Sequence, residues 1–332
     1  MKKIFIRSPY FIEVDEVGQT NAKIEIFLWN KGFSEPVTPN YTLTKNIASA
    51  TQNLIAWNVS NFAKDFIKPV SPINVSVPTE EDAACWCYMK VLRYSDDIEL
   101  DDETFVCLNG YTQYLNGYNQ STTDAIVPLV NEDIILTHDK YINCWLDSDA
   151  SDYEWEWGTD DDIISLPTEG TLYKLPIAYA NRNRLLFESD IIFNVVSNEV
   201  CEPKYTPVIC SFINRYGGWQ YLTFFKANSS SIDVTSKDYN LLPSSIDYNT
   251  SQGQKRIFNP QGKQKIKCNT GWVDENYFEL IQDLLLSEVV LLDNKPAIVK
   301  SQSSEIKTHL KDKNINYEIE FEFNYGLINN VI

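Results

Sequence analysis

The stretch Asn316-Tyr317-Glu318-Ile319-Glu320-Phe321-Glu322-Phe323 alternates aromatic or aliphatic residues with glutamates. A period of two puts the apolar side chains on one face of a β-strand and the carboxylates on the other. Spread along a strand, these carboxylates do not converge on a pocket. The pattern therefore indicates a half-buried sheet whose glutamates face solvent or a neighbouring subunit, and it favours a scaffold over a catalytic centre.

The same alternation recurs in residues 23–29, where Ile24, Ile26 and Leu28 share a face. Further strand-like runs are expected within residues 4–43, 73–77, 85–94, 185–196, 205–225, 297–300 and 315–323. Residues 228–254 are polar and turn-rich, which indicates loops. We predict a mainly β fold, with two antiparallel β-sandwich-like domains and one or two short helices.

Two segments have helical character. Residues 60–67 offer Ser60 as an N-cap and Pro69 as a stop, and this short helix is expected to plug one end of a sandwich. Residues 274–287 place four apolar side chains on one face, while Asp274 and Glu275 suit the positive end of the helix dipole. The four are Tyr277, Ile281, Leu284 and Leu285.

A chain of 332 residues suggests two domains. An acidic run without basic residues ends at Asp162, and Pro167 and Gly170 follow it. We place the boundary near 165–178, which gives an N-terminal domain of residues 1–170 and a C-terminal domain of residues 171–332.

Composition restricts the function classes. With 46 acidic and 28 basic residues the net charge is −18, which disfavours binding to nucleic acid or anionic lipid. Charges and Pro9 interrupt the first residues, so no secretory signal is expected, and residues 284–292 fall short of the roughly 20 apolar residues of a membrane span. The seven scattered cysteines indicate reduced, mostly buried thiols. We expect a soluble protein assembled in a cytoplasm.

Metal and cofactor motifs are incomplete, so no cofactor or metal is expected. Residues 147–152 resemble a calcium loop, but Asp152 replaces the required glycine and Gly158 stands where a bidentate glutamate belongs. A solvated acidic loop is the favoured interpretation, with cation binding left open. Cys85 and Cys87 are interpreted as two small apolar side chains on one strand face, without the further ligands of a zinc site.

Catalytic patterns are equally weak. Residues 96–97 and 101–103 are acidic clusters interpreted as exposed hairpin ends. The two histidines, His138 and His309, lie in no recognisable catalytic context. Gly217-Gly218 separates two strand-like runs and predicts a hairpin turn instead of a phosphate loop. We expect a protein that is not an enzyme.

Two segments of opposite charge are candidate contacts between subunits. Residues 255–267 are basic and contain no acidic residue; a solvated loop is one interpretation, and contact with the acidic loop of a neighbouring subunit is the other. The candidate contact residues are Asp147, Asp149, Asp152, Asp160, Asp161, Asp162, Lys255, Arg256, Lys263, Lys265 and Lys267.

Several short motifs occur together in the C-terminal half. They are Cys201-Glu202-Pro203-Lys204-Tyr205-Thr206-Pro207-Val208, Phe212-Ile213-Asn214-Arg215-Tyr216-Gly217-Gly218-Trp219-Gln220, Phe224-Phe225-Lys226, Asn269-Thr270-Gly271-Trp272, residues 284–288 and residues 315–322. In combination they resemble tail and neck structural proteins of tailed bacteriophages infecting Bacteroidota, including crAss-like phages. Ser8-Pro9-Tyr10-Phe11-Ile12 and Asn109-Gly110-Tyr111 are similar to the same group, whereas the acidic loop has no counterpart in its pattern.

The resemblance implies a non-enzymatic virion protein, a ring, hub or adaptor subunit of a phage tail. Its partners would be copies of itself and other tail or neck proteins, without a membrane. If its inner surface lines a DNA conduit, carboxylates would keep the passing genomic DNA from adhering. The resemblance carries no catalytic residues.

Two alternatives remain open. One is a host-surface or glycan-binding module, with Trp155 and Trp157 as a stacking platform beside acidic residues. The other is a hydrolase with paired carboxylates, which would require two acidic side chains facing a common cleft.

Overall fold

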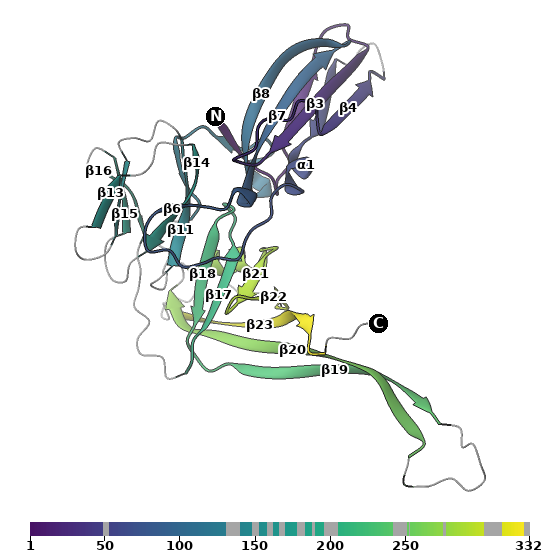
Figure 1. The fold of residues 1–332 in the computed structure, drawn as a ribbon, viewed down its shortest axis with the longest axis vertical. Helices are drawn as coiled ribbons and strands as arrows, with labels where there is room; N and C mark the ends of the chain where they lie inside the picture. The colour runs from purple at the N-terminus through teal and green to yellow at the C-terminus, as the bar shows by residue number, and fades with distance from the viewer. Residues whose placement is uncertain are drawn as a thin grey trace. The chain divides into compact units, whose positions relative to one another are not determined.

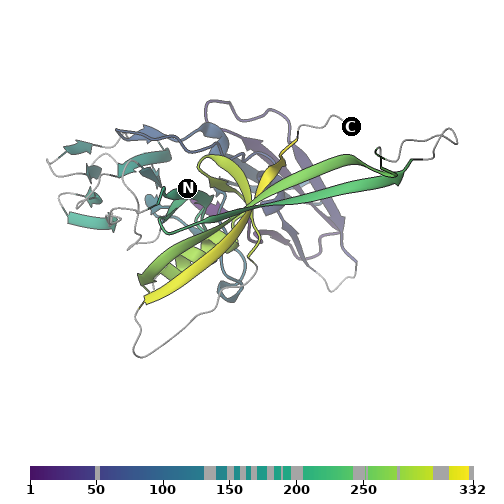
Figure 2. The same cartoon turned by 90° about the horizontal axis from the view of Figure 1, so that it is seen from below.

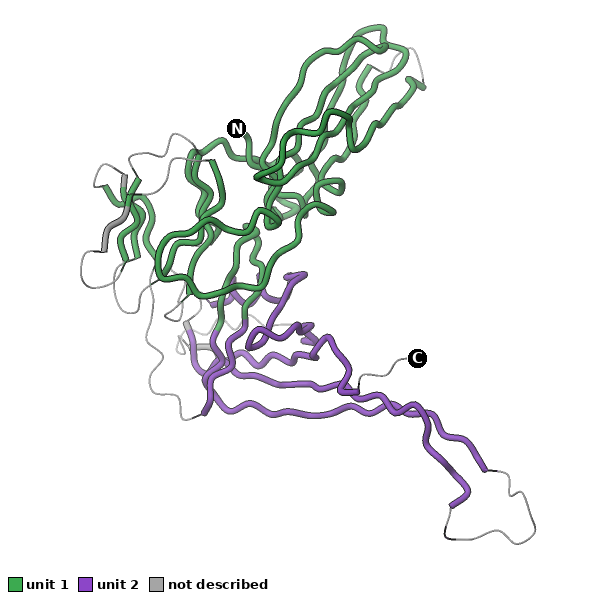
Figure 3. Tube along the Cα trace, in the orientation of Figure 1, with its two compact units in different colours: residues 1–201, 211–222 green, residues 202–210, 223–332 purple. Residues whose placement is uncertain are grey.

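The computed structural model divides the chain into two compact units, which are coloured separately in Figure 3. Unit 1 comprises residues 1–201 and 211–222, and unit 2 comprises residues 202–210 and 223–332. The structure describes residues 1–48, 53–130, 140–147, 153–157, 162–165, 170–177, 183–187, 190–195, 205–241, 251, 253–274, 277–301 and 314–328. The division differs from a boundary at 165–178, since residues 171–201 lie in unit 1.

Residues 1–224 form the following elements, many of which Figure 1 labels. They are β1 Lys2–Phe5, β2 Phe11–Asp15, β3 Asn21–Trp29, β4 Tyr41–Asn46, β5 Leu54–Asn58, α1 Ser60–Lys64, β6 Thr79–Glu80, a 3-10 turn Ala83–Cys85, β7 Trp86–Ser95, β8 Ile98–Leu108, a 3-10 turn Tyr114–Asn116, β9 Ser121–Thr122, β10 Ile126–Pro128, β11 Lys140–Leu146, β12 Tyr153–Trp157, β13 Asp162–Ser165, β14 Thr171–Ile177, β15 Asn183–Phe187, β16 Asp190–Val195, β17 Val208–Ile213 and β18 Trp219–Phe224.

The remaining elements belong to unit 2. They are β19 Ser229–Asn240, β20 Lys255–Asp274, α2 Tyr277–Leu285, β21 Val290–Leu292, β22 Lys295–Val299 and β23 Asn314–Gly326. The predicted fold class is confirmed: the chain is mainly β, its sheets are largely antiparallel, and the described residues contain two short α-helices.

The main sheet of unit 1 has six strands in the order β4-β3-β7-β8-β1-β9. All its neighbours pair antiparallel except β1 and β8, which are parallel. Period-two alternation directs Ile24, Ile26 and Leu28 of β3 into a core that the β2–β5 pair and α1 complete. The sandwich-like layering expected from residues 23–29 is therefore present in unit 1.

A second core lies on the opposite face of the same sheet. Trp86 and Val106 point to this side and pack with Trp145 and Leu172 of the sheet β10-β11-β14-β6. The rings of Trp86 and Trp145 meet edge to face, with centroids 4.8 Å apart. β14 pairs with β11 over its full length, which ties residues 171–177 to unit 1.

The short helix α1 was predicted at the right place but with the wrong cap. Ser60 is the first helical residue, and Val59 occupies the cap without a side-chain hydrogen bond. The Ser60 hydroxyl instead donates to the Ser8 carbonyl and accepts from the Tyr10 amide. These long-range hydrogen bonds occupy the hydroxyl that was expected to cap the helix. Phe62 and Phe66 pack against the core of the sandwich, as expected of a plug.

Other local predictions also fail. Residues 73–77 form no strand. The helix predicted at 274–287 is present as α2, but its start is wrong: Asp274 is the last residue of β20, and the described part of α2 begins at Tyr277. Cys85 ends a 3-10 turn and joins the second core, whereas Cys87 joins the first, so the two thiols do not share a face.

Five strands of unit 2 follow the order β21-β22-β23-β20-β19. In β23, Tyr317, Ile319 and Phe321 are buried, as their alternation predicts. Phe321 meets Phe224 edge to face at 5.7 Å. The prediction of loops for residues 228–254 is wrong in part, because 12 of these residues form β19, a strand paired with β20.

Candidate assembly surface

The β19–β20 pair forms a long ribbon, defined here as β19 together with residues 255–267 of β20. It extends beyond the other strands of unit 2 in the two views of Figures 1 and 2. β23 pairs with β20 only from Lys263 onward. Among the strands that the structure describes, residues 234–240 and 255–262 are thus a two-stranded hairpin without a third strand. Such a hairpin is marginally stable in water by itself, so a partner surface would stabilise it.

Every residue of β19 is exposed, including its apolar and aromatic residues Ile232, Val234 and Tyr239. Val234 is 65% exposed and Ile257 is 69% exposed, and Ile232 and Phe258 are also open to solvent. At the far end, the rings of Tyr239 and Phe258 meet edge to face at 6.0 Å. The ribbon therefore presents apolar side chains that nothing within its own described unit covers.

A bulge interrupts the ribbon midway. Thr235 faces Gln261 and Lys237 faces Phe258, so two residues of β20 oppose one of β19. Asn259 has a positive φ of 49°, a conformation that asparagine tolerates better than most residues, and Pro260 follows it. A bulge increases local twist, and it also interrupts the flat edge that would invite indiscriminate strand pairing.

At its base the ribbon carries a ladder of charges that the sequence did not predict. Lys263 pairs with Glu322 at 3.0 Å, Lys267 pairs with Glu318, and Lys265 contacts Asp233 at 2.6 Å. Lys265 also lies 3.6 Å from Glu320, and Lys300 lies 3.4 Å from Glu322. The glutamate face of β23 and the basic run of β20 thus neutralise each other within one sheet.

The ladder shifts two side-chain pKa values. A hydrogen bond from Lys263, reinforced by Lys300, holds the pKa of Glu322 below its ordinary value. A hydrogen bond to Asp233 raises the pKa of Lys265. Both shifts favour the charged forms of Glu322 and Lys265.

The Glu322 shift predicts a pH-dependent contribution to stability. A carboxyl group with a lowered folded-state pKa stabilises the fold above its ordinary pKa of 4.5, and this is lost as the pH falls through the lowered value. Glu322→Gln should therefore lower the thermal midpoint at pH 7, and the gap from wild type should close towards pH 3. Circular dichroism melts across this range check it, with exposed Glu16→Gln as the matched control. A gap independent of pH would contradict the assignment.

The basic candidates are placed clearly. They lie in a strand and not in a loop, since residues 255–267 are part of β20. Lys263, Lys265 and Lys267 are engaged in the ladder, Lys255 pairs with Asp238 at 3.3 Å near the far end, and Arg256 lies opposite Tyr239. Contact with a neighbouring subunit stays a prediction, and Lys255 and Arg256 are the exposed members near the far end of the ribbon.

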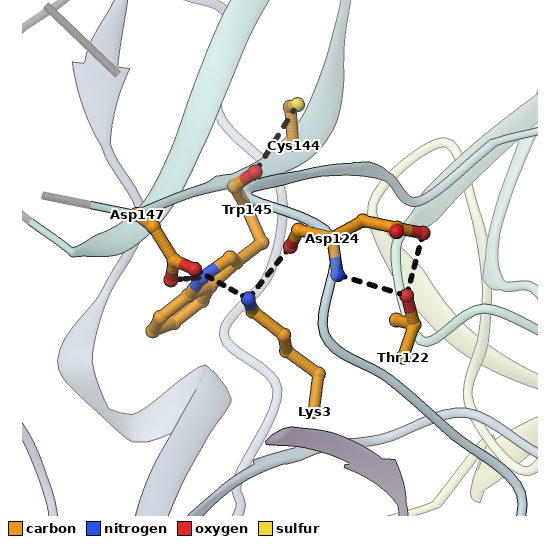
Figure 4. A network of polar contacts seen from close by, with 6 residues as sticks. All are labelled: Lys3, Thr122, Asp124, Cys144, Trp145 and Asp147. Carbon is orange, nitrogen blue, oxygen red and sulfur yellow. Dashed lines mark hydrogen bonds and ion pairs between the residues drawn. The ribbon is translucent and has the colours of Figure 1, made fainter. Parts of the chain in front are cut away.

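Among the acidic candidates, Asp147 has a role inside unit 1. Its carboxylate accepts from Lys3 Nζ at 2.6 Å and from Trp145 Nε1 at 2.7 Å, as Figure 4 shows. Lys3 is fully buried and also donates to the Asp124 carbonyl at 2.6 Å. Asp162 is the first residue of β13. Asp149, Asp152, Asp160 and Asp161 lie outside the described residues.

The tryptophans of the glycan-binding alternative are not an exposed pair. Trp155 is fully buried, and its Nε1 donates to the Pro176 carbonyl at 2.9 Å. Trp157 is half-buried on the same strand. A buried ring cannot serve as a stacking platform, so this arrangement gives that alternative no support. The exposed tryptophan in the described chain is Trp272, at a bulge of β20.

A small pocket in unit 1 is lined by apolar residues together with Glu81, Cys85, Asn143 and Trp219. Glu81 accepts from Asn143 Nδ2 at 2.7 Å and lies 3.4 Å from Lys174 Nζ. Burial, followed by the charge of Glu81, raises the pKa of the Cys85 thiol to about 12. Cys85 is thus a protonated thiol at neutral pH. Within the described part of the chain, no three His, Cys, Asp or Glu side chains gather as a metal site.

Comparisons with known proteins return no match: no family model, no curated protein and no solved structure matches the sequence. Among the described helices, none is long and apolar enough to cross a bilayer.

Proposed function

We propose that this chain is a non-enzymatic virion structural protein that forms an oligomeric ring, hub or adaptor in a phage tail. The ribbon supports this proposal best. A two-stranded hairpin with Val234, Ile257 and Phe258 exposed gains stability when another surface buries it. In an oligomer of this chain, a neighbouring copy would provide the surface that buries the hairpin.

The resemblance of the C-terminal motifs to phage tail proteins supplies the setting. In a tail, a net charge of −18 would disfavour adhesion of passing DNA to the subunit. Assembly would take place in the host cytoplasm before the particle is complete. Antibodies raised against the chain should label the tails of virions that carry it, and labelling of capsids alone would contradict the tail assignment.

Native mass spectrometry and negative-stain electron microscopy of the full chain test self-assembly directly. A closed oligomer with rotational symmetry is expected at micromolar concentration. A monomer at every concentration would overturn the ring, hub or adaptor role.

The double variant Ile257→Thr/Phe258→Thr should weaken the oligomer roughly tenfold or more. Burying two such side chains contributes about 2–4 kcal/mol, and threonine retains the strand propensity of the ribbon. Because both residues are exposed, the unfolding midpoint should change little. Sedimentation velocity measures the association, and circular dichroism measures the fold.

The matched control is Val37→Thr/Leu115→Thr, which removes two highly exposed apolar residues elsewhere. This control should sediment as wild type does. Equal effects of both variants would mean that general surface hydrophobicity, and not the ribbon, drives association.

A further inference from the structure

The far end of the ribbon is basic and apolar in an otherwise acidic protein. We define the ribbon tip as residues 237–240 and 255–258, which include Lys237, Lys255 and Arg256 with one acid, Asp238. Ile257 and Phe258 stand exposed beside these charges. A partner that fits the ribbon tip must therefore combine apolar contacts with negative charge.

A surface of that chemistry exists in unit 1, at the turn that joins β7 and β8. We define the hairpin end as Asp96-Asp97-Ile98-Glu99-Leu100-Asp101-Asp102, in which five acids surround two apolar residues. Ile98 is 69% exposed, and Leu100 is exposed as well. The hairpin end is thus the counterpart of the ribbon tip in both charge and hydrophobicity.

The hairpin end is held in a defined shape. Asp96 and Asp97 both have positive φ, as in the tight turns that match the twist of a β-hairpin. The Asp96 carboxylate accepts from the amides of Thr20 and Asn21 at 2.9 and 3.0 Å. Asp101 forms an ion pair with Arg93. The other acids, Asp97, Glu99 and Asp102, form fewer interactions within the described chain, and Asp102 lies 3.6 Å from Lys90.

We propose that the ribbon tip of one copy docks on the hairpin end of a second copy of this chain. This inference rests on the proposed self-assembly and names the two surfaces that make it. Phe258 and Arg256 share one face of the ribbon with Tyr239, so Phe258 would cover Ile98 and Leu100 while Arg256 lies opposite Glu99 and Asp102. Ile257 and Lys255 point to the other face and would flank the contact. Two different patches on each copy give a head-to-tail contact, which propagates around a ring.

Charge favours a copy of the chain over nucleic acid as the occupant. The chain carries 18 more acidic than basic residues, so a phosphate backbone approaching the tip would meet a repulsive field from the rest of the protein. A second copy of the chain has the same excess of acidic residues, but its hairpin end also offers an apolar patch. Duplex DNA offers no apolar surface to receive Ile257 and Phe258.

A charge-swap experiment tests the pairing in the full chain. Lys255→Glu/Arg256→Glu makes the ribbon tip acidic, and Glu99→Lys/Asp102→Lys reverses the two charges of the hairpin end that would face it. Each variant alone should associate roughly tenfold to a hundredfold more weakly, because like charges now face each other. Mixing the two variants, or combining all four changes in one chain, should restore oligomers. Lys68→Glu/Lys295→Glu controls for the change in net charge.

The outcomes separate the pairing from the function. Native mass spectra in which the mixture and the combined chain reassemble support the pairing; spectra in which both stay dissociated while each variant keeps the wild-type melting curve overturn it. If neither variant weakens the wild-type oligomer, the pairing is overturned and the proposed function stands. A wild-type chain that is monomeric throughout overturns both.

Discussion

Lys3→Ala is expected to lower the free energy of unfolding by about 3–5 kcal/mol, the usual cost of removing one partner of a buried ion pair. Lys3 is fully buried, and it neutralises Asp147 while also donating to the Asp124 carbonyl. The substitution would leave the carboxylate with Trp145 as its remaining donor and would open a cavity. Urea unfolding of wild type and variant measures the difference.

Two further variants separate charge from packing. Lys3→Met/Asp147→Asn removes both charges and largely keeps the volume, so it should recover most of the loss. Lys2→Ala breaks an exposed pair with Glu103, and it should cost about 0–1 kcal/mol. Equal losses in the free energy of unfolding for Lys3→Ala and Lys2→Ala would show that the buried pair stabilises the fold no more than the exposed pair does.

Gly217→Ala should destabilise unit 1 by about 2–5 kcal/mol, for two additive reasons. Gly217 has a φ of +88°, which costs an alanine about 1–2 kcal/mol. A Cβ there would also lie 2.7 Å from the carbonyl carbon of Asn109 and 2.8 Å from the amide nitrogen of Gly110. Because these are backbone atoms, relief requires the backbone after β8 or the turn at Gly217 to shift, which costs about 1–3 kcal/mol more.

Gly32 supplies the matched control. Its φ is also +88°, but nothing lies within 4 Å of an added Cβ. Gly32→Ala should therefore cost only the conformational part, about 1–2 kcal/mol. Chemical unfolding of both variants isolates the close approach. Equal losses would mean that the turn between β17 and β18 has room to relax.

Strands that alternate in hydrophobicity could be predicted from the sequence. Ile24, Ile26 and Leu28 are buried together, as are Tyr317, Ile319 and Phe321. In both cases the signal lies within one strand, because one face must be apolar for the strand to pack. The hairpin turn at Gly217-Gly218 was also predictable, since glycine marks a backbone conformation that other residues avoid.

The ribbon could not be predicted by the same reasoning. Ser229–Asn240 has no buried face, so its period is hidden and its polar residues suggest loops. Its strand state comes from pairing with β20, which the segment's own pattern does not encode. The ladder was missed for a related reason: Lys263 meets Glu322, 59 residues away, and register decides that meeting.

The acidic candidates illustrate how distance in sequence conceals function. Asp147 belongs to a run of acids that suggested a solvated loop, yet its partner Lys3 lies 144 residues earlier. The neighbouring sequence does not distinguish an acidic residue that forms a buried ion pair from one that contacts another subunit. Lys255 and Arg256 remain predicted contact residues because they lie on the exposed tip of the ribbon.

The placement of β1 has a consequence for how the protein is made. β1 lies between Phe105–Leu108 of β8 and Ser121–Thr122 of β9. Residues 2–5 therefore have no neighbours to pair with until more than a hundred later residues have emerged from the ribosome. The main sheet of unit 1 is completed only after Thr122 has been translated, and until then it has an open strand position that chaperones or a wrong strand could occupy.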